Sequence, residues 1–162
     1  MAQAVATEKA VYALEKIGPP PYRGEDLFVQ RRWLSHYKGD TYSTDMLGVI
    51  ALGLAATKYS LGDFVRYVKG AKYSNRHTWG ELMQVDLLAE VQELSIAAFF
   101  FVGRHDYTAS FALAEEFYQA LTAPAKRLVW FEDSAHMPNV EEPQKFQREI
   151  IEVWRGLGIG AS

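Results

Sequence analysis

Apolar residues recur every three or four positions through the first half of the chain, which is the spacing of amphipathic helices. Gly18 and the prolines that follow it end the first helix sharply, and Gly39 can take the left-handed conformation that closes the second. Ser60 and Asp63 have the spacing of a capping box at the start of the fourth helix, which Gly70 follows. The predicted helices cover residues 7–17, 25–37, 45–59, 61–68 and 78–94.

The pattern changes after Leu94. Residues 97–102 form a continuous apolar run, which favours a strand buried on both faces, as in a parallel sheet. A helix capped by Ser110 follows, then a second strand over residues 126–131, and Pro143 stands at the first position of a last helix. The apolar stripe of that last helix comprises Phe146, Ile150, Trp154 and Leu157. This order predicts an α/β unit whose parallel strands are joined by a right-handed crossover.

Two polar stretches follow the predicted strands, and each carries a residue suited to proton transfer. Asp106 comes just after the first strand and His136 just after the second. Because parallel strands end at the same edge of a sheet, we expect the two side chains to lie close together there. Asp106 can then orient the imidazole through Nδ1 while Nε2 acts as a base. The alternative is that Asp106 only caps a turn and His136 is an exposed loop residue.

The amino-acid composition limits the kinds of molecule that the chain is expected to bind. With 162 residues the chain is long enough for one domain with a real core. Its 17 basic and 20 acidic residues give a net charge of -3 without a dense basic patch, so we expect neither nucleic acid nor a membrane surface as a partner. The chain has no cysteine and its N-terminus is unlike a secretory signal, which favours a cytoplasmic location.

Three stretches carry a resemblance to a known family: residues 99–108 (FFFVGRHDYT), 131–138 (FEDSAHMP) and 141–143 (EEP). They resemble the C-terminal end of α/β-hydrolase fold peptidases and esterases, closest to proline iminopeptidase-type enzymes. The resemblance implies that Asp106 is the catalytic acid and His136 the base of a serine hydrolase that cleaves amide or ester bonds. It implies no metal or organic cofactor. Residues 1–84 then read as a helical cap-like segment and residues 85–162 as the C-terminal part of the hydrolase core.

The chain departs from this family in two respects. It has no G-x-S-x-G nucleophile elbow and no counterpart of the early sheet strands, so the predicted fold is an incomplete α/β-hydrolase fold. Ser134, Ser110 and Thr108 lie near the pair in sequence, but each is more economically a loop or cap residue. Two hypotheses follow. Either a complementing N-terminal hydrolase chain supplies the nucleophile, or the chain is a catalytically inactive remnant that assembles as a homo-oligomer and acts in binding.

A substrate, if the chain is active, is expected to be a small molecule or peptide-like. The cap-like segment contains aromatic and sulfur-bearing side chains that either line a pocket or form core. They are Trp33, Tyr37, Tyr42, Met46 and Trp79. Acids that could recognise an amino group are also present there, namely Glu25, Asp26, Asp40 and Glu81. His36 and His77 lack metal-ligand spacing and are expected to be surface or interface residues.

Overall fold

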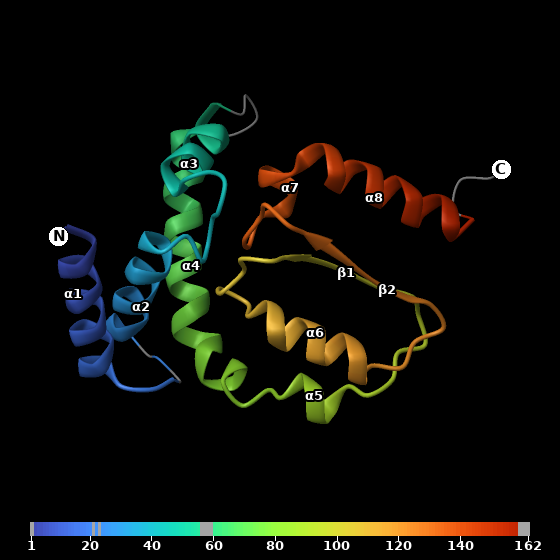
Figure 1. Ribbon diagram of the computed structural model, residues 1–162, viewed down its shortest axis with the longest axis horizontal. Coiled ribbons are helices and arrows are strands. Elements are labelled where there is room, and N and C mark those ends of the chain that lie inside the picture. The colour runs from blue at the N-terminus through green and yellow to red at the C-terminus, as the bar shows by residue number, and fades with distance from the viewer. Residues whose placement is uncertain (1, 21, 23, 56–59, 159–162) are drawn as a thin grey trace.

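The first half of the molecule is helical, as the apolar spacing predicts (Figure 1). A computed structural model describes residues 2–20, 22, 24–55 and 60–158. Its first five helices are α1 (Ala2–Ile17), α2 (Glu25–His36), α3 (Met46–Ala55), α4 (Leu61–Leu82) and α5 (Leu87–Glu90). Gly18 adopts a positive φ of 74° after α1, which confirms it as the residue that ends this helix. The end of the helix expected over 45–59 lies outside the described residues.

Helix α4 corrects the prediction of two separate helices. It runs through Gly70 without a break and takes in residues 78–82 of the helix expected over 78–94, while the separate four-residue α5 forms a later part of that range. A glycine inside a helix costs about 1 kcal/mol relative to alanine, which is too little to end a helix that is otherwise well formed. The capping box at its start is confirmed, because Ser60 and Asp63 each accept the other's main-chain N–H. Hydrogen bonds from Ser60 and Arg66 lower the pKa of Asp63 to about 2.

The turn after α2 also differs from the prediction. The left-handed residue is Lys38, with φ 63°, and not Gly39. The glycine at position 39 instead avoids a steric clash, since a Cβ there would lie 2.6 Å from Leu34 Cδ1 and 3.1 Å from Tyr107 Cβ. The missing side chain therefore allows the turn after α2 to approach the loop that contains Asp106.

The second half forms an α/β unit, and its two strands are parallel as predicted. Strand β1 (Ala98–Gly103) pairs with β2 (Lys126–Phe131) in the register Ala98 to Lys126. Helix α6 (Phe111–Ala120) connects the strands, and α7 (Pro138–Glu141) and α8 (Pro143–Gly156) follow β2. The structure is thus α/β, with a two-stranded parallel sheet among the described residues.

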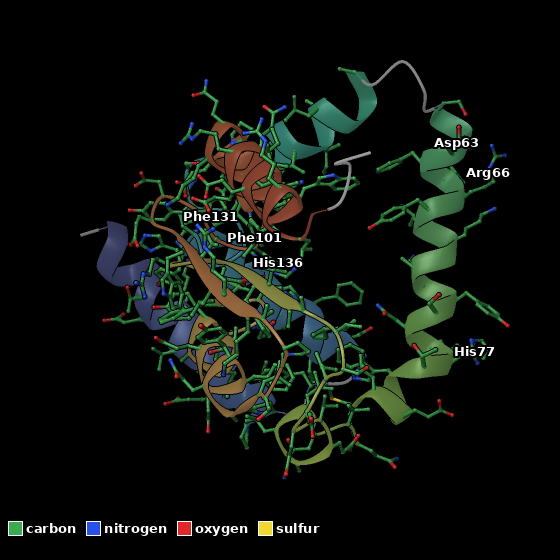
Figure 2. All side chains as sticks on the ribbon, turned by 90° about the vertical axis from the view of Figure 1, so that its right-hand side faces the viewer. Asp63, Arg66, His77, Phe101, Phe131 and His136 are labelled. Atoms are coloured by element: carbon green, nitrogen blue, oxygen red, sulfur yellow. The ribbon has the colours of Figure 1, made fainter. Side chains whose placement is uncertain are left out.

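Helices α6 and α8 cover opposite faces of the sheet (Figure 1). On one face Phe100 packs edge-on against Phe117 of α6, with ring centroids 5.9 Å apart. On the other face Phe101 packs against Phe131 and against Phe146 of α8, at 5.9 and 5.3 Å. Figure 2 shows Phe101 and Phe131 beneath α8. The alternation of a strand places successive phenylalanines on the two faces, so both helices are anchored by one apolar run.

Neither outer edge of the sheet has a neighbouring strand among the described residues, and the edge formed by β1 carries Phe99 and Phe101. The N–H groups of Ala98 and Arg104 point toward β2, with bonds of 2.9 Å, so strand alternation turns the main-chain groups of Phe99 and Phe101 to the other edge. The prediction of a strand buried on both faces is wrong for residues 98–101, which are only half-buried. A two-stranded sheet cannot enclose its first strand, which explains the difference.

The total exposed surface area of the chain is large, as expected for a sheet whose two edges are both open in the described part of the chain. The chain exposes 11981 Å² of surface, whereas a compact monomer of its mass is expected to expose about 8100 Å². Of the apolar stripe predicted for α8, Phe146 packs on the sheet, but Trp154 is 55% exposed. Ile96 and Leu113, which flank the sheet, are also more than half exposed. No described helix is both long and apolar enough to cross a membrane.

Candidate functional site

Asp106 lies in the loop that follows β1, and its carboxylate makes contacts in two directions. Oδ1 accepts the main-chain N–H groups of Thr108 and Ala109, both at 2.9 Å, which fixes the side chain against its own loop. Oδ2 lies 2.9 Å from Nδ1 of His136. Helix α6 begins directly after Ser110 as predicted, but the Ser110 side chain makes no capping bond. The carboxyl group is buried, with only 7% of the residue exposed.

His136 lies in the loop after β2, so the parallel pairing of the strands brings it to Asp106. Its main-chain N–H donates to the carbonyl of Asp40 at 3.1 Å, and the N–H of His105 donates to the carbonyl of Ser134 at 3.1 Å. The His105 ring does not share in the pair, because it stacks on Tyr42 with ring centroids 3.5 Å apart. The imidazole of His136 is thus held from the Nδ1 side while 43% of its side chain remains exposed.

The close approach of the two loops depends on Gly103. A Cβ on this residue would overlap the carbonyl oxygens of Ser134 and Ala135. Both Gly103 and Ala135 are buried, so neither main chain has free space to retreat into. The glycine at the end of β1 is therefore what allows the histidine loop to pass directly over the strand.

The surroundings of His136 favour its charged form. The hydrogen bond to Asp106 raises the pKa of His136 above its ordinary value of 6.5, while partial burial acts in the opposite direction. The charge of Asp106 raises the pKa further, Arg31 of α2 lowers it, and Asp40 raises it. Arg31 and Asp40, both from the helical first half of the chain, therefore act on the pKa of His136 in opposite directions.

We expect the His136 ring to titrate above pH 6.5 in the wild-type chain, and at a lower pH in an Asp106→Asn variant. Because the folded pKa is raised, the stabilisation it contributes is fully present below about pH 6.5 and is lost as the pH rises through the folded value. NMR titration of the imidazole checks the first expectation. Urea unfolding checks the second, since the gap between wild type and Asp106→Asn should be wider at pH 5.5 than at pH 9. A gap that widens with pH would contradict it.

The hydroxyl groups near the pair are not arranged as nucleophiles. The Ser134 side chain is fully buried and donates to Oε2 of Glu142 at 2.7 Å. Thr108 Oγ1 is buried and has no hydrogen-bond partner among the described residues. In the described part of the chain, neither these hydroxyls nor that of Ser110 forms a hydrogen bond to His136.

The aromatic residues predicted in residues 1–84 do not form one pocket, because they line two different hollows or stack elsewhere. Trp33 and Tyr37 line an open hollow of about 380 Å³ together with Tyr107, the residue after Asp106. Trp79 lines a different hollow, of about 520 Å³, and donates its indole N–H to the carbonyl of Tyr22 at 3.0 Å. Tyr42 stacks on His105, and the side chain of Met46 lies outside the described residues. The hollow beside Tyr107 is therefore the one adjacent to the Asp106 loop.

The other candidate ligands of the cap-like segment have local partners. His36 packs edge-on against Trp33 and Tyr37, and His77 Nδ1 lies 2.8 Å from the Tyr73 carbonyl. The Asp40 carboxylate accepts bonds from the Ser35 hydroxyl and the Thr41 main chain. Within the described ranges, no group of three or more histidine and acidic side chains has the arrangement of a metal site.

Two acidic residues that sequence reasoning noted only as part of a resemblance prove to hold the histidine loop. Glu142 accepts the Asp133 N–H at 3.1 Å and the Ser134 hydroxyl, and Glu141 accepts the Ala135 N–H at 2.7 Å. Their only sequence signal was their position directly before Pro143, at the start of a helix. Nothing in that position predicts contact with a loop that precedes them.

Comparison with known proteins gives one distant similarity. The chain is 27% identical over 137 residues to a probable aminopeptidase, YbaC, of Bacillus subtilis (strain 168). The aligned region covers 83% of this chain and 43% of the aminopeptidase, so the chain spans less than half the length of that relative. No model of a known protein family matches the chain, and no solved structure matches it.

Proposed function

We propose that this chain carries the acid and base of a serine hydrolase of amide or ester bonds, with Asp106 as the acid and His136 as the base. The observation that carries the proposal is the 2.9 Å contact between His136 Nδ1 and Asp106 Oδ2. The similarity to a probable aminopeptidase supports a hydrolase-like, and more narrowly a peptidase-like, protein. In this reading residues 1–84 form a cap-like segment over an incomplete α/β-hydrolase core.

The ring nitrogen through which His136 contacts Asp106 suits the role of a base. Asp106 occupies Nδ1, so the proton of a neutral His136 resides there and Nε2 is left as the acceptor. A nucleophile placed at Nε2 would give up its proton to the ring, and the buried carboxylate would stabilise the imidazolium that forms. The high exposure of the His136 side chain leaves room for such a group.

The nucleophile is proposed to come from polypeptide beyond residues 1–162. The sequence has no G-x-S-x-G elbow, and the hydroxyls nearest to the pair make no described bond to His136. The unpaired edge of β1 is a place where a further strand can add, because Phe99 and Phe101 direct main-chain groups toward it. A strand added there would extend the sheet on the side of Asp106.

A chimera tests this proposal. The segment of this chain that aligns with the Bacillus subtilis aminopeptidase would replace its counterpart in that protein. The chimera is expected to react with a fluorophosphonate at a serine outside the grafted segment, while the isolated chain forms no adduct. Asp106→Asn in the chimera should slow hydrolysis of an aminoacyl p-nitroanilide on the order of 10,000-fold, and His136→Ala should abolish labelling. A folded chimera whose labelling rate is indifferent to His136→Ala would refute the assignment.

The second candidate function is that of an inactive, self-assembling binding domain. It is favoured by the exposed surface of 11981 Å², whose excess over a compact monomer is larger than a standard protein interface. Two copies that join at the β1 edge would cover part of this excess. Sedimentation velocity separates the candidates, because this one requires a dimer or larger species at micromolar concentration. A dilute monomer would exclude it.

A further inference from the structure

Glu141, the last residue of α7, receives hydrogen bonds from two distant parts of the chain. Its Oε1 accepts the successive main-chain N–H groups of Tyr42 and Ser43 at 2.6 and 2.7 Å, and that of Thr44 at 3.3 Å. Its Oε2 accepts the main-chain N–H of Ala135 at 2.7 Å. The two oxygens of one carboxylate therefore join the cap-like segment to the residue directly before His136.

The chemistry of this contact demands a carboxylate. Successive N–H groups that converge on one point form an anion-binding nest, to which the Ser43 hydroxyl adds a bond of 3.3 Å, and the Ala135 N–H approaches the other oxygen. A carboxylate has acceptor capacity on both oxygens, whereas an amide has one oxygen and one donor group. Only an ionised acid satisfies both sides at once.

Neighbouring bonds show that the contact belongs to a wider connection. The carbonyl of Gly39 accepts the N–H of Tyr107, and the carbonyl of Asp40 accepts the N–H of His136. Residues 39–44 of the cap-like segment, which we term the cap strap, thus contact the loops of both Asp106 and His136. Glu141 is the side chain that connects the far end of the cap strap to the histidine loop.

We propose that Glu141 is a positioning residue, whose two carboxylate oxygens hold the cap strap against the histidine loop and thereby keep His136 within hydrogen-bond reach of Asp106. The placement of the cap and the orientation of the base are then set together. The proposal rests on the proposed role of His136 as the base. It assigns no contact between Glu141 and a substrate.

The test is a Glu141→Gln variant of the full chain studied by NMR. The oxygen of the glutamine side chain can still accept the N–H groups of Tyr42 and Ser43. The NH₂ group of the side chain then faces the N–H of Ala135, and two donors cannot form a hydrogen bond with each other. We expect amide exchange at Ala135 to accelerate roughly tenfold or more, the usual effect of losing a bond to a charged acceptor, while Tyr42 and Ser43 change less. The Nδ1 proton resonance of His136 should move upfield or disappear, and the ring should titrate at a lower pH.

Glu152→Gln is the matched control, because Glu152 lies on α8 and pairs with Arg127 on the sheet, away from both loops. It should leave the His136 resonance and Ala135 exchange unchanged. A Glu141→Gln variant that is folded and retains the wild-type His136 resonance and titration would overturn the positioning role. That outcome is distinct from failure of the hydrolase proposal, which the chimera tests through labelling and turnover.

Should Glu141→Gln unfold, Glu141→Asp provides the second reading. Aspartate keeps the charge but is one methylene shorter, so it cannot reach the cap strap and Ala135 together. The proposal then expects a folded chain in which the His136 signal is perturbed. An unperturbed signal in Glu141→Asp would contradict it.

Discussion

A Gly103→Ala variant is expected to unfold at a clearly lower urea concentration than the wild-type chain and to lose the contact between His136 and Asp106. The added methyl group would overlap the carbonyl oxygens of Ser134 and Ala135, both of which belong to main chain that has no room to move aside. Overpacking of this kind costs about 1–3 kcal/mol, and a clash with main chain falls at the upper end or beyond it. Urea unfolding followed by circular dichroism measures the loss.

Gly70→Ala is the matched control for this substitution. Gly70 lies inside α4, and a Cβ there would meet no atom within 4 Å. Alanine is favoured over glycine in a helix interior by roughly 1 kcal/mol, so this variant should be slightly more stable than wild type. If Gly103→Ala were as stable as Gly70→Ala, the close packing of the histidine loop on β1 would be wrong.

A Phe131→Ala variant is expected to lose about 3–5 kcal/mol of unfolding free energy, the range for truncating a buried phenylalanine. Phe131 is fully buried at the end of β2, where its ring packs between Phe101 and Phe146. Its carbonyl also accepts the N–H of Arg104 at 2.9 Å, so a shift of the main chain here would move the start of the Asp106 loop. Since whole domains are stable by only about 5–15 kcal/mol, this single change threatens the fold.

Phe28→Ala provides the comparison, because Phe28 is 68% exposed on α2. It should shift the urea midpoint far less, as truncation of an exposed ring leaves no cavity. Equal destabilisation by the two variants would mean that the phenylalanine cluster between β1, β2 and α8 does not form the core of this half of the molecule.

The sparse core explains why both of these positions matter so much. Phe131, Leu121 and Ser134 have the largest fully buried side chains among the described residues, and they lie around the sheet and its loops. Helix α4 stands apart from the strands in Figure 2, where its labelled residues Asp63, Arg66 and His77 lie on the side away from them. The stability of the described fold is thus concentrated in the α/β unit that also carries Asp106 and His136.

Much of the α/β unit was predictable because its signals are local. The continuous apolar run before Gly103 predicts a strand of the parallel type, and Pro143 marks the start of a helix within one residue. Parallel strands place the residues that follow them at one edge, and for this reason Asp106 and His136 were expected together. The division of residues 61–94 was wrong because Gly70 costs less than the helix gains.

The amino-acid sequence by itself determined the helical character of the first half, the strand-helix-strand order of the second half, the parallel pairing, and the identity of the acid and the imidazole that meet. These depend on apolar period, turn residues and strand direction, which act over a few positions. Only the tertiary structure decided that Gly103 makes room for the histidine loop, that Lys38 takes the left-handed turn, and that Glu141 connects that loop to residues 42–44. The contacts of Gly103 and Glu141 join residues up to about a hundred positions apart, and contacts at such separation leave no periodic trace in a single sequence.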